Sequence, residues 1–320
     1  MKGTFQMKIK DWPLPPFLFH FQQHHPINWE KIFNRCAPID VEIGFGTGEM
    51  LMQLAESYPD RNIIGIEKNI ERICKTLLAI DNKKRQNKNS QMGNIRIIEI
   101  DATLAFQKLF NQQCIDNIYS LFPCPWPKTA HAKHRLFSNA FLKLINNRLK
   151  PQGRLKIITD FLPYQKWIIE QAKGCGFSIN NRITHAGYNT KFEQKWRQAG
   201  QKEFFETELT KKRHIILAGQ EKIMLRVYQI KQFKAENFHL YDKTGKISVI
   251  FKEIIFDKKR QKAVVRTIVA EDNATQHFWI AIEKKTKYWH IYKAEGQNIF
   301  PTPGIALALE MVYKAAKQSY

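Results

Sequence analysis

Three glycines at alternate positions have the spacing of a ligand-binding turn. They are Gly44, Gly46 and Gly48 in the stretch VEIGFGTGEM, which begins at residue 41. Glycine lets the backbone turn sharply and lets a ligand approach the main chain closely. A dinucleotide site carries the pattern G-x-G-x-x-G, and here the third glycine comes one residue early. This tighter spacing, with Glu42 just ahead of it, favours S-adenosylmethionine over a nicotinamide dinucleotide.

Acidic residues recur at two later points where apolar runs end. Glu67 follows the glycines by about twenty residues, and the pair Asp101–Ala102 closes a third apolar run. A carboxylate at the first point can accept both ribose hydroxyls of an adenosine. An acid at the second point can meet the adenine amino group. The simpler alternative is that all these acids are ordinary strand-end residues.

A second stretch whose residues could take part in chemistry is LFPCPWPKTAHAKHR, which runs from Leu121 to Arg135. Its three prolines stiffen the chain directly after an apolar run, and Cys124 lies between the first two. That cysteine is a candidate nucleophile, metal ligand or bystander. The five cysteines of the chain are widely spaced, with no zinc-ligand grouping, so we expect no metal site. Reduced thiols are typical of a cytoplasmic protein, which is the location we expect.

The elements that must position these residues alternate between strands and helices. Apolar runs predict strands at 39–43, 62–67, 94–101, 117–123 and 154–160. Helical spacing predicts helices at about 49–58, 70–78, 102–110, 136–149 and 163–175, with a polar loop at 81–91. This alternation implies an α/β fold with a parallel sheet covered on both faces. Such sheets bind ligands beyond the carboxyl ends of their strands, near the point where strand order reverses.

The pattern changes after about residue 216. Turn-like polar stretches join short β-rich runs at 225–233, 247–256, 263–270, 278–282 and 288–292, and an amphipathic helix is expected at 304–318. These runs predict an antiparallel β-rich α+β domain with a helix over one face. We therefore expect an N-terminal arm at 1–37, a cofactor-binding domain at 38–216 and a smaller β-rich domain at 217–320.

The net charge points to a polyanionic partner. The chain has 51 lysines and arginines against 29 acids, a formal charge of +22, of which residues 221–320 carry +8. Such an excess favours nucleic acid over an anionic membrane surface. No apolar run approaches 18 residues, so we expect no membrane span.

From about residue 28 to residue 209 the chain resembles the bacterial tRNA (guanine-N7)-methyltransferase family. The segments that carry the resemblance are VEIGFGTGEML, GIEKN, the pair at 101–102, FPCPWPK with HAKHR after it, LKPQGRLKIITD and TKFEQKW. The resemblance implies a Rossmann-like seven-stranded methyltransferase domain at 38–216. It implies transfer of a methyl group from S-adenosylmethionine to N7 of a guanine in the variable region of tRNA. It says nothing about residues after about 216, and it leaves open whether the protein is a monomer or a homodimer.

The resemblance also implies roles for individual residues. Cofactor contacts are implied for Glu42, Gly44, Gly46, Gly48, Glu67, Asp101 and Ala102. Cys124 and Asp160 occupy the candidate catalytic positions. Substrate contacts are implied for Lys128, Asp160, Thr190, Lys191, Phe192 and Glu193. The basic residues expected to meet phosphate are His131, Lys133, His134 and Arg135.

The chain departs from the family at Cys124, where the family has an aspartate regarded as catalytic. Guanine N7 has a free lone pair and loses no proton on methylation, so a general base is not obligatory. A carboxylate would still hold the positive charge that develops on the base, which a neutral thiol does poorly. We therefore expect reduced or altered activity. Thr129 and Ala130 also replace residues that the family tends to have as basic ones.

Three other functions remain open from the sequence. Cytosine-5 methyltransferases use a cysteine after a proline at this strand end, as in Pro123–Cys124, because C5 must be activated by covalent addition. RNA enzymes of that class usually carry a second cysteine at the next strand end, where this chain has Thr159–Asp160. An RNA-binding protein with a degenerate site is the second alternative, and the intact glycine loop argues against it. The glycine spacing and the charge disfavour the third, a nicotinamide dehydrogenase.

The C-terminal domain interleaves aromatic and basic residues in HFWIAIE and KYWHIYK. Such strands can stack bases and neutralise phosphates, so we expect an auxiliary RNA-binding domain. In the simpler alternative most of these aromatic side chains form the core of the sheet. An oligomerisation module or a structural appendage are the other possibilities. Deletion of 217–320 is expected to weaken tRNA binding and to flatten its salt dependence.

Overall fold

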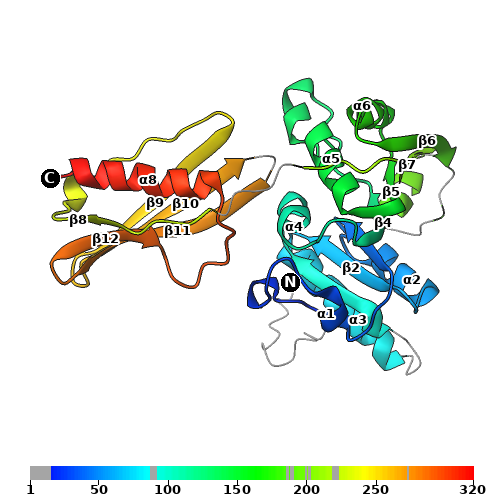
Figure 1. The fold of residues 1–320 in the computed structure, drawn as a ribbon, viewed down its shortest axis with the longest axis horizontal. Coiled ribbons are helices and arrows are strands. Elements are labelled where there is room, and N and C mark those ends of the chain that lie inside the picture. Colours follow the sequence, from blue (N-terminus) through cyan, green and yellow to red (C-terminus); the bar gives the residue numbers. More distant parts are fainter. Residues whose placement is uncertain are drawn as a thin grey trace. The chain divides into compact units, whose positions relative to one another are not determined.

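The computed structural model describes residues 16–86, 92–184, 187, 191–198, 200, 203–217, 223–271 and 274–320. The chain forms two compact units, Met1–Leu217 and Ala218–Tyr320. Figure 1 shows an α/β unit in blue to green and a β-rich unit in yellow to red. Within the described residues, no helix is long and apolar enough to cross a membrane.

The first unit is built on a seven-stranded sheet in the order β3-β2-β1-β4-β5-β7-β6. Its strands are β1 (Ile39–Ile43), β2 (Asn62–Glu67), β3 (Ile95–Glu99), β4 (Ile115–Leu121), β5 (Leu149–Thr159), β6 (Phe177–Thr184) and β7 (Phe204–Lys211). The first five strands are parallel, and β7 runs antiparallel to both of its neighbours. Every residue of β1 and β2 is buried, as expected for parallel strands covered on both faces. The predicted Rossmann-like fold is confirmed.

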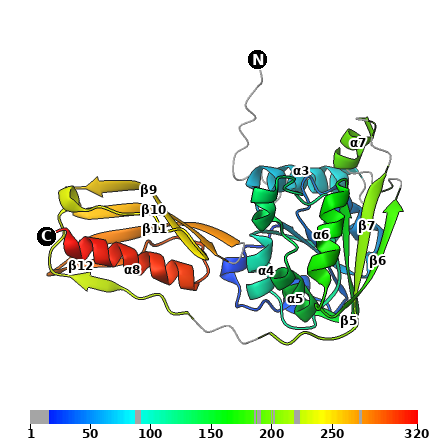
Figure 2. The same cartoon turned by 90° about the horizontal axis from the view of Figure 1, so that it is seen from above.

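Helices cover this sheet in two layers. The helices of the unit are α1 (Trp29–Phe33), α2 (Glu49–Ser57), α3 (Ile70–Gln86), α4 (Ala102–Lys108), α5 (Asn139–Arg148), α6 (Leu162–Ala172) and α7 (Lys191–Gln198). Short 3₁₀ segments lie at η2 (His20–Gln22), η3 (Met92–Asn94) and η4 (Thr129–His134). The apolar sides of α2 and α3 share one core cluster with β2 and β3. The other layer is formed by α4, α5 and α6, in which α5 contacts both α4 and α6 (Figure 2).

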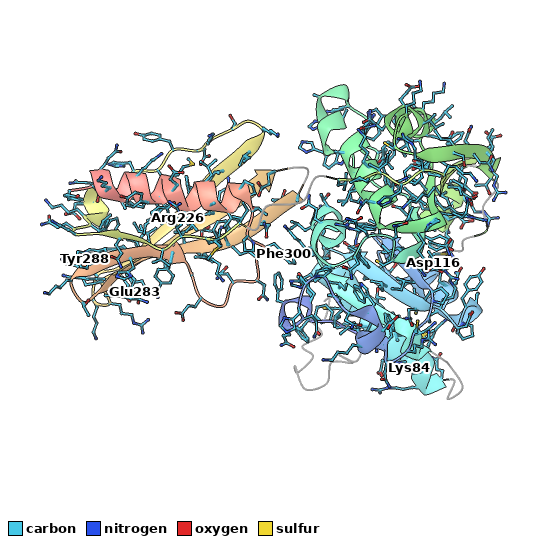
Figure 3. All side chains as sticks on the ribbon, in the orientation of Figure 1. Lys84, Asp116, Arg226, Glu283, Tyr288 and Phe300 are labelled. Atoms are coloured by element: carbon cyan, nitrogen blue, oxygen red, sulfur yellow. The ribbon has the colours of Figure 1, made fainter. Side chains whose placement is uncertain are left out.

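The expected polar loop at 81–91 is wrong for residues 81–86, which are the last turns of α3. The structure explains why charged residues remain helical there. Asp81 pairs with Arg85, and Lys83 reaches Glu56 on α2 at 2.8 Å. The basic residues also lie at the carboxyl end of the helix, where the helix dipole favours positive charge. Lys84 marks this end in Figure 3.

The described part of the expected arm packs into the first unit. Residues 16–18 pair with β3 through Leu18 N to Ile97 O and Ile97 N to Pro16 O, both 2.8 Å. Trp29 and Phe33 on α1 are buried, and the Trp29 ring stacks on Phe110 at 5.2 Å between centroids. From residue 16 onward, this segment therefore belongs to the core of the α/β unit.

An ion pair fixes the start of the central strand. Asp40 on β1 is 1% exposed, and Arg61 donates two hydrogen bonds of 2.6 Å to its carboxylate. The amide of Asn117 on β4 donates a third at 2.8 Å. Because the fork of the guanidinium matches both carboxylate oxygens, the buried charge of Asp40 is compensated.

Replacing Arg61 with methionine is expected to lower the free energy of unfolding by about 3 kcal/mol, because it leaves a buried carboxylate without its countercharge. Urea denaturation followed by circular dichroism measures the change. The control is Lys75→Met, which removes an exposed ion pair with Glu71. It is expected to change stability little, since exposed pairs contribute little. Equal, small effects of both substitutions would contradict the argument.

The second unit is an antiparallel sheet in the order β8-β12-β11-β10-β9 with one helix. Its elements are β8 (Tyr228–Ile230), η5 (Ala235–Asn237), β9 (Ile247–Asp257), β10 (Lys262–Glu271), β11 (Ala274–Lys285), β12 (Tyr288–Lys293) and α8 (Pro303–Gln318). The helix lies along one face of the sheet (Figure 2) and buries Ile305, Leu309 and Val312 against it. The predicted meander with a covering helix is confirmed, and β8 is shorter than the run expected at 225–233.

Candidate active site

The two stretches singled out in the sequence follow neighbouring strands at one edge of the first sheet. The glycine loop follows β1, and the proline-rich loop follows β4, which pairs directly with β1. Strand order reverses between these two strands, because β2 and β3 lie on one side and β4 and β5 on the other. A reversal point of this kind leaves a crevice at the carboxyl ends of the strands, where ligands bind in open α/β sheets.

The glycine loop needs glycine at all three positions. Gly44, Gly46 and Gly48 have φ values of 70°, 59° and 79°, which side chains rarely tolerate. A Cβ atom at Gly48 would lie 2.3 Å from the side chain of Thr76 on α3, so this glycine also permits close packing of helix and loop. A Cβ atom at Gly44 would meet no atom within 4 Å. The main chain at Gly44 is therefore open to a ligand.

A cluster of carboxylates surrounds this loop. Glu42 on β1 is 3% exposed, and its Oε2 atom has no hydrogen-bond partner among the described residues. Burial is the main cause that raises the pKa of Glu42 to about 8, and the nearby charges of Glu49 and Glu67 contribute to this shift. An unpartnered, buried carboxyl group beside an open main chain fits a ligand with positive charge or hydroxyl donors. S-adenosylmethionine has both, in its sulfonium and amino groups and in its ribose.

Glu67, at the end of β2, forms a hydrogen bond with the same loop. Its Oε2 atom accepts a hydrogen bond from Gly46 N at 3.2 Å, and its Oε1 atom accepts from the backbone N–H groups of Lys68 and Asn69. These contacts hold the carboxylate at the strand end. Arg72 lies 3.7 Å from the same side chain.

The acid expected near an adenine lies at the start of α4. Asp101 is the N-cap of this helix and accepts a hydrogen bond from Thr103 N at 2.8 Å, and Ala102 is the first helical residue. Burial raises the pKa of Asp101 above its usual value. The cap fixes the carboxylate at the same edge as Glu42 and Glu67, because all three lie at or just after the carboxyl ends of parallel strands.

The proline-rich loop is held in an unusual conformation around Cys124. Phe122 and Trp126 have φ values of 51° and 42°, although neither is glycine. Such values are costly and persist only where surrounding contacts impose them. Cys124 itself is exposed, on a loop whose backbone is fixed on both sides.

Arg135 supplies the contacts that hold this loop. Its Nε atom donates to Pro125 O at 2.9 Å and its second guanidinium nitrogen to Trp126 O at 3.2 Å. The guanidinium also lies over the rings of Tyr164 and Trp167 on α6, at 5.6 and 5.2 Å from their centroids. Arg135 was expected to meet phosphate, but it is 8% exposed and faces inward. We therefore assign it to the support of the loop.

The outer side of the loop carries an exposed tryptophan, an exposed lysine and two exposed histidines. Trp126 is 38% exposed, and the rings of His131 and His134 lie 5.9 and 5.3 Å from its ring. Lys128 is exposed just before η4, and Lys133 lies within η4. Trp126, Lys128, His131 and His134 are exposed and accessible to a large ligand, and a contact with phosphate here stays a prediction.

The remaining expected substrate residues lie at the end of β5 and in α7. Asp160 directly follows β5, beside the proline-rich loop after β4, and burial raises its pKa. Glu193 is 1% exposed in the first turn of α7. The backbones of Lys191 and Phe192 begin that helix, and Thr190 lies outside the described residues.

Three contributors were not identified from the sequence. Glu49 adds a carboxylate near Glu42, and Tyr164 and Trp167 form the aromatic bed of Arg135. The aromatic pair follows a strand end at helical spacing, which gives only a general signal of packing. In the part of the chain that the structure describes, no three His, Cys, Asp or Glu side chains are arranged so that they could hold a metal ion.

Most of the first unit matches a known protein family. A family model described as a putative methyltransferase matches residues 36–206. A tRNA (guanine-N(7)-)-methyltransferase of Chlorobium phaeobacteroides is 40% identical over 188 residues, which are 58% of this chain and 89% of the relative. One of Thermotoga maritima is 25% identical over 316 residues, covering 96% of this chain and 97% of the relative. Among solved structures, the 16S rRNA methyltransferase KamB aligns with 58% of this chain and 93% of its own, at 12% identity and a TM-score of 0.44.

Proposed function

The chain belongs to the tRNA (guanine-N7-)-methyltransferase family, and we propose that it transfers a methyl group from S-adenosylmethionine to N7 of a guanine in the variable region of tRNA. The observation that carries this proposal is that the two loops follow neighbouring strands at the strand-order reversal. The glycine loop after β1 offers an open main chain and acids for the cofactor. The rigid loop after β4 lies next to it, where a base must be held.

When bound, S-adenosylmethionine supplies a methyl group on a positively charged sulfur. Glu67 lies against the glycine loop with its carboxylate, and Glu42 can ionise when a cation binds, so both suit that cation. Guanine N7 has a free lone pair and loses no proton on methylation, so no residue of the chain has to act as a general base. The task of the protein is then to align the two reactants and to stabilise the charge that moves to the purine. In this proposal Asp160, which directly follows β5, accepts hydrogen bonds from the N–H groups of the base.

The test is to incubate the protein with S-adenosylmethionine and unmodified tRNA and to identify the methylated nucleoside by mass spectrometry. The expected product is 7-methylguanosine in the variable region. A 5-methylcytidine product would instead support Cys124 as a nucleophile, and trapping on 5-fluorocytidine RNA would support that alternative independently. Cofactor binding without any methylated nucleoside would favour the non-catalytic RNA-binding alternative.

The raised pKa of Glu42 predicts that cofactor binding releases a proton. Near pH 7 the carboxyl group is mostly protonated, because its pKa is about 8. A cationic ligand favours the ionised form, so it lowers this pKa and releases up to one proton. Calorimetric titrations at pH 7 in buffers of different ionisation enthalpy measure that number. The affinity for the cofactor should rise with pH until the pH passes about 8. The total gain is about tenfold for each unit by which the ligand lowers the pKa of Glu42.

The matched variant for this prediction is Glu42→Gln, which keeps the shape of the protonated group. It is expected to abolish the proton release and to flatten the pH dependence of affinity, whereas Glu56→Gln on the exposed side of α2 changes neither. The stability of the free protein depends on pH in the opposite direction to the affinity for the cofactor. A folded pKa above the unfolded value of 4.5 stabilises the protein at low pH, and this contribution falls as the pH rises from about 4.5 to about 8. Proton release that is unchanged in Glu42→Gln would refute the assignment.

A further inference from the structure

One face of the second unit's sheet faces away from α8. In an antiparallel sheet, residues directly opposite each other share a face. Trp279 on β11 is opposite Arg266 on β10, and Glu283 is opposite Lys262. Their neighbours along the strands, such as Phe278 and Ile280, point into the core under α8. The described side chains of the outer face are mostly half-buried or exposed, so this face presents charged and aromatic groups to solvent.

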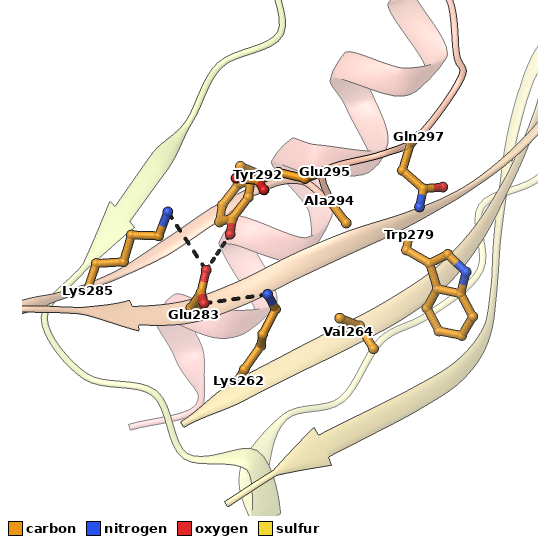
Figure 4. Close-up of a pocket in the computed structure, with 9 residues that line it drawn as sticks. All are labelled: Lys262, Val264, Trp279, Glu283, Lys285, Tyr292, Ala294, Glu295 and Gln297. Atoms are coloured by element: carbon orange, nitrogen blue, oxygen red, sulfur yellow. Dashed lines mark hydrogen bonds and ion pairs between the residues drawn. The ribbon is translucent and has the colours of Figure 1, made fainter. Parts of the chain in front are cut away.

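This face contains a cavity of about 390 Å³ (Figure 4). Trp279, Val264 and Ala294 line it on one side and form an apolar wall. Arg266 adjoins Trp279 across the strand pair, and 44% of its side chain is exposed. Trp279 is half-buried, and an indole that lines a cavity next to a guanidinium offers a stacking surface to any nucleobase, since every base has a π-face.

The other side of the cavity carries a fixed group of charges. Glu283 accepts a hydrogen bond from the hydroxyl of Tyr292, and its oxygens lie 3.4 Å from Lys262 Nζ and 3.8 Å from Lys285 Nζ (Figure 4). Lys285 Nζ also lies 4.8 Å from the centre of the Tyr292 ring. The bond from Tyr292 and the two lysines lower the pKa of Glu283, so its carboxylate stays charged at neutral pH. These interactions place the ammonium groups of Lys262 and Lys285 and the hydroxyl of Tyr292 across the cavity from Trp279.

We propose that this cavity binds an unpaired nucleotide of the tRNA, with the base on Trp279 and the phosphate beside Lys262 and Lys285. The proposal rests on the proposed function for the identity of the RNA. Residues 221–320 carry a charge of +8, which attracts a polyanion and opposes pairing with a second copy of the same surface. The match to the Thermotoga maritima relative covers 96% of this chain and therefore includes most of this unit.

The test measures binding of fluorescent, unmodified tRNA by the full-length protein without cofactor. Trp279→Ala is expected to raise Kd about tenfold, within the range found when a stacked base loses its aromatic partner. Trp279→Phe should keep most of the affinity, because it keeps a ring. Tyr241→Ala is the control, since it removes an aromatic ring that is 81% exposed elsewhere in the unit. An unchanged Kd for Trp279→Ala, or an equal loss in the control, overturns the proposal.

A charge variant tests the phosphate contact separately. Lys262→Gln is expected to reduce the slope of log Kd against log salt by about 0.7 to 0.9, the value for one lost phosphate contact. The matched control is Lys314→Gln on α8, because Lys314 is also paired with a glutamate but belongs to the helix on the other face. Equal slopes in wild type and Lys262→Gln would count against the cavity as a phosphate site.

Cross-linking covers the case in which Trp279→Ala fails to fold. Wild-type protein irradiated with 4-thiouridine tRNA is expected to give adducts within residues 274–293, whereas adducts confined to the first unit would overturn the proposal. A dimer in sedimentation that Trp279→Ala dissociates would also overturn it, because the face would then be a self-interface. If wild type makes no 7-methylguanosine but Trp279 still governs tRNA binding, only the proposed function fails. If methylation occurs and Trp279→Ala changes neither Kd nor KM, only this inference fails.

Discussion

Replacing Arg135 with leucine is expected to lower kcat by about 100-fold, because a displacement of about 1 Å at a reacting centre has an effect of this size. The guanidinium holds the carbonyls of Pro125 and Trp126 and rests on two rings of α6. Without it, the backbone around Cys124 can leave the unfavourable φ values of Phe122 and Trp126. The base would then be held less accurately against the methyl group.

Three measurements separate this positioning role from a general loss of stability. The dissociation constant for S-adenosylmethionine should stay the same, since Arg135 contacts the proline-rich loop and α6. Arg135→Lys should recover only part of kcat, because an ammonium lacks the planar fork and stacks less well on aromatic rings. The control is Arg96→Leu, which removes a guanidinium that also binds backbone carbonyls and lies over Phe33. Arg96 is near the amino end of β3, so its loss should lower stability without a matching fall in kcat. An equal fall in both variants would contradict the positioning role.

The sequence predicts the parallel core and the edge that carries the glycine loop and the three acids, because both depend on local patterns. The strands β1 and β2 are continuous apolar runs, and the glycines at 44, 46 and 48 mark positive φ values that other residues avoid. Three acids at the ends of successive strands must then lie at one edge, whatever the side-chain details. These inferences need no knowledge of distant contacts.

The features that the sequence did not predict depend on contacts between distant residues. Residues 81–86 are polar enough for a loop, and ion pairs along α3 and with α2 keep them helical. The strands β6 and β7 were not assigned from the pattern, and β6 is exposed at several positions because it lies at the sheet edge. Arg135 looked like one more basic residue in a phosphate-binding rim. Its inward direction follows from Tyr164 and Trp167, about thirty residues later in the chain.

Cys124→Asp is expected to raise kcat/KM for tRNA methylation, by roughly 10- to 100-fold on the scale of single electrostatic groups in active sites. The thiol is exposed on a loop whose geometry Arg135 already fixes, so the new carboxylate needs no rearrangement to reach solvent or substrate. It can hold the positive charge that moves onto the purine and accept hydrogen bonds from the base. A neutral thiol offers neither interaction to a useful extent.

The control for this prediction is Cys124→Asn, which has a similar shape without the charge and should leave kcat/KM near the wild-type value. Initial rates with tritiated S-adenosylmethionine and unmodified tRNA provide the measurement. The two chemistries at this loop predict opposite results, because a nucleophilic cysteine cannot be replaced by aspartate. A clear loss of activity in Cys124→Asp, together with a comparable loss in Cys124→Asn, would show that the thiol itself is required. A gain confined to the aspartate would show that the reaction runs by direct attack of N7, and that the chain lacks only a charge at that position.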